Sequence, residues 1–342
     1  TAVGFAAGKL VSTGINNTLI GGQAGDALTT GSYNVAIGYA ALSTEDGNGR
    51  NVAIGFNALV AQNAGVDAYN VAIGYNTGAS ISTGVENTLI GSLAGDAITT
   101  GGYNTALGYA ALGASILPSF NTAIGNASLA SNVHGHKNTA VGQATLAVMA
   151  PTGSADTHNT AVGFHAGTAV TTGTQNTLIG GLAGDALTTG YRNAVLGYNA
   201  LGAETTGAAS VAIGYHALRF QNTESYNYNI AIGAEAGQAI TTGDNNTIVG
   251  GLAGDALTTG GRNVAIGLGA LGTEDTTGKA VAIGYGALGT QNAGSDSYNV
   301  AVGYEAGNDI TTGVQNTLIG SGAGDALTTG SYNTVLGYNA LT

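Results

Sequence analysis

The sequence predicts an all-β protein, a parallel β-solenoid (β-roll) of about 20 coils, which range from a 17-residue to a 21-residue unit. Three observations indicate this fold. A short motif of the form NVAIG recurs along the whole chain, its copies mostly keep a 17-residue spacing, and Gly ends the motif in every copy. Repeats with such a short period are typical of solenoids. We therefore expect one continuous repeat array over residues 1–342 instead of separate globular domains.

Each repeat is numbered from its Asn, which is position 1. The spacing lengthens to a 19-residue step after Asn51, Ser210 and Ala280, and to a 21-residue step after Asn138. Extra residues in these longer coils should loop out on one side. The chain starts and stops inside a repeat, so we expect it to be an excerpt of a longer fibrous chain.

Positions 2 to 4 carry Thr, Val, Ala, Ile or Leu between the Asn and the Gly, which predicts a short strand between turns. A helix is disfavoured because Gly at position 5 would cost about 1 kcal/mol in each copy. We expect a second short strand near positions 10 to 13 of each coil, as at 26–29.

Residues at positions 2 and 4 point to one face of a strand, and the residue at position 3 points to the other. Both faces are apolar, so one can fill the coil and the other needs cover. Small position 3 residues such as Ala36, Ala53 and Ala72 allow close approach. We therefore predict that the position 3 face joins identical chains in a homo-oligomer. The alternative is a monomeric solenoid whose coil is thick enough to bury both faces.

The repeated Asn and Gly residues predict structural roles. Stacked Asn side chains should form a ladder between coils, and Gly at position 5 should occupy a corner with positive φ or a close approach. Ser210 and Ala280 interrupt the Asn ladder. The first residues of this structural ladder are Asn17, Asn34, Asn51, Asn70, Asn87, Asn104, Gly21, Gly38, Gly55 and Gly74.

The composition disfavours several partners. The net charge is −12 with only seven Lys and Arg residues, so neither nucleic acid nor an anionic membrane surface is an expected partner. There is no Cys, and no apolar run is long enough for a transmembrane helix. Charged residues make up only 8% of the chain, which favours an ordered structure.

A second, 70-residue period overlies the coils. The segment GGQAGDALTTG, at 21–31, returns in related form along the chain and resembles the nonapeptide of calcium-binding β-rolls. Calcium needs six to eight oxygen ligands, whereas these Asp residues recur only about every four coils, so an Asp that bonds local backbone is favoured. The Asp residues concerned are Asp26, Asp96, Asp185, Asp255 and Asp325.

One His-x-His pair, His134 and His136, lies in the irregular 21-residue coil, with Lys137 beside it and His158 one coil later. In a trimer, three such pairs offer six imidazoles to one metal ion. Exposed loop histidines are the favoured interpretation because the pair occurs only once.

No enzyme is predicted. The strings GLGALG and GYGALG match a dinucleotide-binding pattern, but that pattern must open a helix in a βαβ unit. Scattered His and acidic residues on a regular solenoid provide no concave pocket. Tyr at positions 6 and 17 is expected to pack coil on coil; the alternative is an exposed column that stacks on sugars.

The units NVAIG and NTAIG, followed by a small residue at position 8, resemble the head repeats of trimeric autotransporter adhesins (the YadA-like head) and the repeats of tail-fibre proteins. The resemblance covers essentially the whole chain. It implies a homotrimeric, left-handed β-roll in an extracellular fibre, used for attachment to a host-surface glycan or protein receptor. No cofactor and no membrane contact are expected in this segment. The alternative is a repeat segment of a self-assembling extracellular filament.

Overall fold

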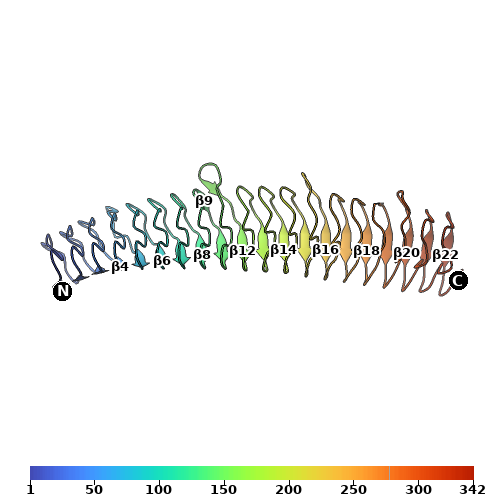
Figure 1. The fold of residues 1–342 in the computed structure, drawn as a ribbon, viewed down its shortest axis with the longest axis horizontal. Coiled ribbons are helices and arrows are strands. Elements are labelled where there is room, and N and C mark those ends of the chain that lie inside the picture. Colours follow the sequence, from blue (N-terminus) through green and yellow to red (C-terminus); the bar gives the residue numbers. More distant parts are fainter. Residues whose placement is uncertain (277) are drawn as a thin grey trace. The chain divides into compact units, whose positions relative to one another are not determined.

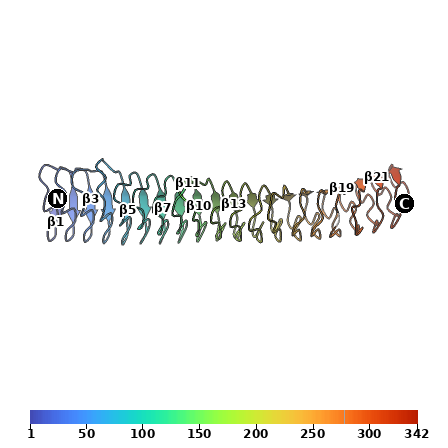
Figure 2. The same cartoon turned by 90° about the horizontal axis from the view of Figure 1, so that it is seen from above.

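The computed structural model describes residues 1–276 and 278–342 and shows an all-β parallel solenoid of about 20 turns (Figure 1). No helix occurs among these residues, and hence none that could cross a membrane. The fold class predicted from the repeats is confirmed. The chain divides into two compact units, Thr1–Thr172 and Gly173–Thr342. Within each unit the coils stand side by side, as Figure 2 shows from above.

The first unit has one main sheet and one small additional sheet. Strands β9 (Gly135–His136) and β11 (Ala155–Asp156) pair with each other in the additional sheet. The strands of the main sheet in this unit are β1 (Ala2–Val3), β2 (Thr18–Ile20), β3 (Val35–Ile37), β4 (Val52–Ile54), β5 (Val71–Ile73), β6 (Thr88–Ile90), β7 (Thr105–Leu107), β8 (Thr122–Ile124), β10 (Thr139–Val141) and β12 (Thr160–Val162).

The second unit continues the same pattern, with one three-residue strand in each coil. Its strands are β13 (Thr177–Ile179), β14 (Ala194–Leu196), β15 (Val211–Ile213), β16 (Ile230–Ile232), β17 (Thr247–Val249), β18 (Val264–Ile266), β19 (Val281–Ile283), β20 (Val300–Val302), β21 (Thr317–Ile319) and β22 (Thr334–Leu336).

The strands stay in register whatever the coil length. Val35 of β3 pairs with Val52 of β4 across a 17-residue coil, and Val52 pairs with Val71 of β5 across a 19-residue coil. Across the 21-residue coil, Thr139 pairs with Thr160 in the same way. The additional residues therefore lie outside the sheet, and a loop beside β9 stands out from the upper edge in Figure 1.

The prediction of a second strand at positions 10 to 13 is wrong, because residues 26–29 form turns and bends. Each coil instead turns through residues with positive φ at positions 7, 9 and the last position. In the second full coil these are Ala40 (53°), Leu42 (52°) and Arg50 (65°). Left-handed residues other than Gly cost about 1–2 kcal/mol each. Extended segments beyond the first strand are limited to β9 and β11 among the strands of residues 1–276 and 278–342, and these lie near the end of their coils, past positions 10 to 13.

The prediction that position 3 faces a neighbouring chain is also wrong. Ala36, Ala53 and Ala72 point into the coil and are 0% exposed, whereas positions 2 and 4 point outward. The alternation along the strand was predicted correctly, but its sides were reversed. The coil interior is thin, so where a Leu from position 9 also fills the space, position 3 is Ala in most coils and Val in the two coils of Val195 and Val335. The alternative of a coil that buries both strand faces is wrong as well, since the outward side chains stay partly exposed.

Two interior positions compensate for each other. In eight coils a Leu at position 9, such as Leu42, accompanies a polar residue at position 12, such as Glu45. In most of the others a Gly at position 9, such as Gly78, accompanies a larger apolar residue at position 12, such as Ile81. All four residues are buried. In these coils one large apolar side chain from the two positions therefore fills the core, whereas the coil of Leu146 and Met149 buries two.

Gly at position 5 is required by both φ and space. Gly38 has a φ of +134°, and a Cβ atom there would lie 2.3 Å from the carbonyl oxygen of Gly55 in the next coil. An L-residue disfavours that φ, and no side chain fits at that distance. The recurring Gly therefore sets how closely successive coils stack.

Candidate interaction surface

The outer face of the sheet is free of charge in both units, with Ile, Val or Leu at position 4 and mostly Val or Thr at position 2. We call the side chains at positions 2, 4 and 6 the sheet face. No Asp, Glu, Lys, Arg or His occupies these positions in any coil. Position 4 remains accessible; for example Ile90 is 36% and Leu107 45% exposed. Parallel sheets usually have both faces covered, and continuous apolar patches of this kind mark interaction sites.

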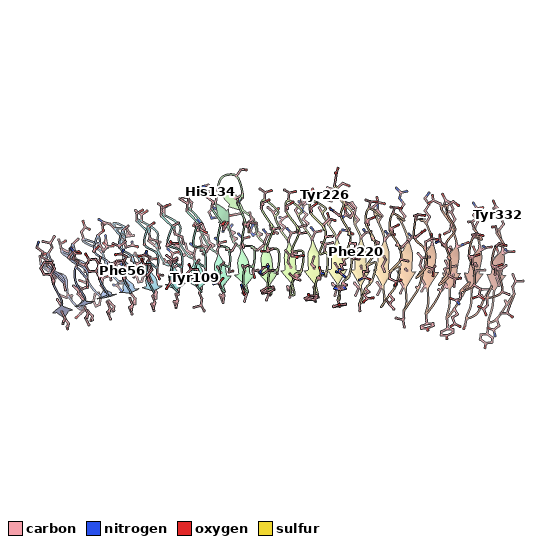
Figure 3. All side chains as sticks on the ribbon, viewed as in Figure 1. Phe56, Tyr109, His134, Phe220, Tyr226 and Tyr332 are labelled. Carbon is pink, nitrogen blue, oxygen red and sulfur yellow. The ribbon has the colours of Figure 1, made fainter. Side chains whose placement is uncertain are left out.

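Aromatic rings at position 6 form a column along one margin of the sheet face. Phe56 stacks on Tyr39 at 5.5 Å and on Tyr75 at 5.4 Å between ring centroids. The rings nevertheless stay about half exposed, at 43% for Phe56 and 55% for Tyr109; both residues are labelled in Figure 3. Coil-on-coil packing therefore accounts for the stacked rings. Because their faces cover one another, they present mainly edges to solvent.

The opposite margin carries the ends of the coils and the longer loops, which we call the loop edge. The Arg50 guanidinium lies 5.4 Å from the ring centroid of Tyr33 and 5.5 Å from that of Tyr69, and its Nε is 2.8 Å from Asp67 Oδ2. Lys279 pairs in the same way with Asp296 and Tyr298. In both cases a cation of one coil holds an Asp and a Tyr of the following 19-residue coil.

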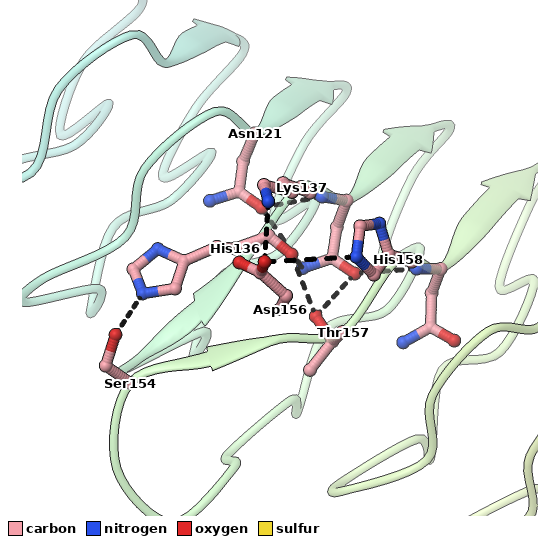
Figure 4. Close-up of polar contacts among 9 residues, drawn as sticks. Asn121, His136, Lys137, Ser154, Asp156, Thr157 and His158 are labelled. Carbon is pink, nitrogen blue, oxygen red and sulfur yellow. Dashed lines mark hydrogen bonds and ion pairs between the residues drawn. The ribbon is translucent and has the colours of Figure 1, made fainter.

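The His-x-His segment lies on the loop edge of the first unit (Figure 4). His136 Nδ1 accepts the Ser119 N–H at 3.0 Å, and its Nε2 is 2.6 Å from Ser154 Oγ. The Lys137 ammonium donates to Asp156 at 2.5 Å and holds the pKa of that carboxyl below its ordinary value. Both ring nitrogens of His136 are thus engaged in hydrogen bonds.

His134 is half-buried on the same loop edge, one residue before β9. Across residues 1–276 and 278–342, no three His, Cys, Asp or Glu side chains are placed to hold a metal ion. Within one chain, the two histidines therefore form no metal-binding cluster.

The five recurring Asp residues occupy half-buried turns. Within a unit they lie four coils apart, so the fold does not bring them together. Burial raises the pKa of Asp96 and Asp255, and bonds to their own and the next backbone N–H offset part of that effect. Asp26 Oδ1 is buried without a hydrogen-bond partner. Asp185 and Asp325 occupy the equivalent turns of their coils.

The Asn residues connect the beginning and end of a coil and join it to the next. Asn17 Nδ2 donates to the Gly31 carbonyl of its own coil at 2.8 Å. Its Oδ1 accepts the backbone N–H of Asn34 in the next coil at 2.9 Å. Where Ser210 replaces Asn, its backbone N–H still bonds Asn193 Oδ1 at 3.0 Å. These contacts stabilise the solenoid and face its interior.

The sequence analysis overlooked a set of buried glutamates. Glu45, Glu204 and Glu274 occupy position 12 and are 0% exposed, and each lies in the coil before a 19-residue coil. Gln291 of the following coil donates to Glu274 Oε2 at 2.8 Å, and Gln221 donates to Glu204 at 3.0 Å. The signal in the sequence was an acidic residue at a position that elsewhere carries apolar or uncharged polar residues, followed by a longer coil.

The two GxGxxG strings open no helix. They form turns in which Gly269 and Gly286 have φ values of 64° and 60°. These turns line a shallow groove of about 410 Å³ together with Leu268 and Tyr285. The strings are therefore coil corners, consistent with the abundance of Gly.

Comparison of the chain with family models, curated proteins and solved structures found no match. The function is therefore inferred from the sheet face and the loop edge.

Proposed function

We propose that this chain is a non-enzymatic segment of an extracellular fibre, the shaft or head of an adhesin or a tail fibre. It spaces or presents a site that attaches to a host surface. The observation that carries the proposal is the charge-free sheet face, which runs through the coils of each unit. A regular solenoid with an apolar outer face suits a structural assembly better than a solitary molecule.

The partner proposed for the sheet face is a second and a third copy of the same chain, in a left-handed homotrimer. Ile37, Ile54 and Ile73 repeat along the face with the spacing of the coils, about 4.8 Å. An identical chain has the same spacing, so its side chains can interdigitate with this face coil after coil. A partner without that period would match only one or two coils.

The loop edge is the proposed contact for a host-surface glycan or protein receptor. It lies across the coil from the aromatic column and carries the Asp, Arg and Lys side chains that the sheet face lacks, together with Tyr residues of its own. Aromatic and Arg side chains are favoured at the centres of interfaces. With a net charge of −12, the chain is a poor match for nucleic acid.

Mass measurement by sedimentation and native mass spectrometry tests the assembly. The wild-type chain should give three copies. The triple substitution Ile37→Asp, Ile54→Asp and Ile73→Asp should give a monomer with an unchanged circular dichroism spectrum, because charge on the sheet face opposes its burial.

The matched control adds the same charge at exposed positions away from the sheet face, through Thr30→Asp, Thr44→Asp and Thr83→Asp. It should remain trimeric. A stable wild-type monomer, or a trimer that survives the three Ile substitutions, would contradict the proposed interface. A mass that keeps rising with concentration would favour the filament instead.

A further inference from the structure

The last residue of each coil belongs to a column on the loop edge, which we call the last-residue column. Its members share one backbone conformation, with a positive φ in every coil. Side chains of successive coils therefore start from equivalent positions, about 4.8 Å apart. Five consecutive members in the first unit, with φ values between 52° and 65°, are Tyr33, Arg50, Tyr69, Glu86 and Tyr103.

The first three of these residues form a sandwich around a cation. The Arg50 guanidinium lies over the ring of Tyr33 at 5.4 Å and over that of Tyr69 at 5.5 Å. The two tyrosines are two coils apart, which corresponds to about 9.6 Å along the solenoid. Guanidinium groups stack favourably on aromatic faces. A slot between two rings at this separation therefore accommodates one guanidinium group.

A second slot lies one step further along the column, between Tyr69 and Tyr103, which are again two coils apart. Arg50 lies over one face of the Tyr69 ring, so the other face is turned toward the coil of Glu86. Tyr103 stacks on Phe120 at 4.8 Å with 2° between the ring planes, so its free face is also turned toward that coil. Tyr69 is 50% and Tyr103 48% exposed. A groove of about 490 Å³ lies against Tyr69 and Glu86, so the slot is open to solvent.

The charge of the second slot suits a cation. Glu86 is exposed, and it is the only acidic residue at the last position of any coil. The nearest cations of the column, Arg50 and Lys137, are paired with Asp67 at 2.8 Å and Asp156 at 2.5 Å. Over residues 1–276 and 278–342, the ion pairs do not include Glu86. The second slot thus has two ring faces and a carboxylate, but no cation of its own.

We propose that the slot between Tyr69 and Tyr103 binds the guanidinium group of an arginine side chain presented by a protein partner. The planar group stacks between the two rings, as Arg50 does in the first slot, and its N–H groups donate to the Glu86 carboxylate. The net charge of −12 attracts a cationic segment to the chain. That the partner belongs to a host surface rests on the proposed function, whereas the binding of a guanidinium group does not.

Titration of two blocked amino acids into the intact chain tests the slot. The probe is N-acetyl-arginine methylamide, and its neutral counterpart is N-acetyl-citrulline methylamide, which has nearly the same shape without the charge. Nuclear magnetic resonance of a chain labelled in its tyrosine rings follows the binding. The arginine probe should shift the ring signals of Tyr69 and Tyr103 in a saturable manner, with an affinity at least about tenfold higher than that of the citrulline probe.

Two substitutions of Glu86 test the role of the carboxylate. Glu86→Gln should weaken the binding of the arginine probe about tenfold, because it removes a charged acceptor. Glu86→Arg places a guanidinium group of the chain in the slot and should abolish binding. Other coils carry Gln175 and Arg50 at the same position, so both substitutions fit the fold. The matched control is Glu224→Gln, which removes an exposed glutamate of the second unit and should bind like the wild type.

Three results would overturn the proposed slot. They are the absence of saturable shifts at Tyr69 and Tyr103, equal affinity for the arginine and citrulline probes, and full affinity in either variant of Glu86. None of these results bears on the fibre, because the mass measurement tests the assembly of chains separately. A wild-type monomer that binds the arginine probe would contradict the assembly and support the slot.

Discussion

Asn34 Oδ1 accepts the backbone N–H of Asn51 at 3.0 Å, one coil further along the chain. Asn51 Oδ1 does the same for the backbone N–H of Asn70 at 3.1 Å, across a 19-residue coil. Each Asn therefore supplies an acceptor that the backbone of the next coil lacks. This relationship makes the Asn column a source of stability in the solenoid.

Replacement of one Asn in the column should be strongly destabilising. Asn87 Nδ2 donates to the Gly101 carbonyl at 3.0 Å and its Oδ1 accepts the Asn104 N–H at 3.1 Å. Asn87→Ala leaves both groups buried without this partner, which should lower the free energy of unfolding by about 2–4 kcal/mol. Chemical denaturation measures the change. The exposed Asn63→Ala serves as the control and should change it by less than about 0.5 kcal/mol.

Gly38→Ala should be among the most damaging single changes. Its Cβ would lie 2.3 Å from the Gly55 carbonyl oxygen, at a φ of +134°. We expect a loss of about 3 kcal/mol or more, since strain and a backbone clash act together. Gly65→Ala is the matched control, because Gly65 has a φ of +71° but open space around it. It should cost only about 1 kcal/mol, measured by the same thermal or chemical unfolding. Equal effects of the two substitutions would show that the contact between coils is unimportant.

Close packing between interior positions 3 and 9 predicts that substitutions at the two positions have coupled effects on stability. A Cβ atom at Gly95 would lie 2.9 Å from Ile98 Cδ1 and 3.0 Å from Leu89 Cδ1. Gly95→Ala should therefore cost about 1–3 kcal/mol in unfolding free energy. Leu89→Ala alone should cost about 2–5 kcal/mol, because it removes a buried side chain. The double variant should be more stable than the sum predicts, by at least about 0.5 kcal/mol in a double-mutant cycle. Simple additivity would mean that the two positions do not share one space.

The burial of Glu45 should make the stability of the chain depend on pH. Burial raises the pKa of Glu45 above its ordinary value, with a smaller opposing effect from the bonds of Asn48. A carboxyl whose pKa is higher in the folded state contributes stability at low pH, and this is lost as the pH rises through the folded pKa. Glu45→Gln should therefore stabilise the chain at about pH 7, by about 1 kcal/mol, because it removes a buried charge.

The difference between Glu45→Gln and the wild type should shrink as the pH falls through the folded pKa of Glu45. Unfolding midpoints measured at several pH values check this expectation. A difference that stays constant, or grows in acid, would show that Glu45 is ionised as readily in the fold as in the unfolded chain.

Much of the fold could be predicted from the sequence because every coil repeats the same short pattern of residues. The 17-residue spacing predicted stacked parallel strands, and the alternation at Ala36 and Ile37 predicted two opposite faces. Alternation does not tell which face is inside, and both faces were apolar. The size of Ala36 was attributed to contact between chains, whereas it reflects a coil too thin for more at that position.

The remaining errors have a conformational origin. Leu42 and Ala40 adopt positive φ values, although neither residue type favours them, so their identities offered no sign of a corner. The burial of Glu204 was not predicted, because residues of the longer coil that follows supply hydrogen-bond donors to it. The ion pair between Arg50 and Asp67 on the loop edge could not be predicted from the sequence, because the two residues meet only when successive coils stack.

The constant register of the strands has a consequence for variation. Val52 and Val71 pair across a 19-residue coil, and Thr139 and Thr160 pair across the 21-residue coil. The pairing is the same as between strands separated by a 17-residue coil. Strand pairing is therefore the same whatever the number of residues in the coil between the two strands. The entropic cost of closing a loop also rises only slowly with its length. A peptide grafted beside Gly65 should leave β4 and β5 paired. Such a scaffold can acquire new surface segments at its loops, while the architecture that carries them is inherited unchanged.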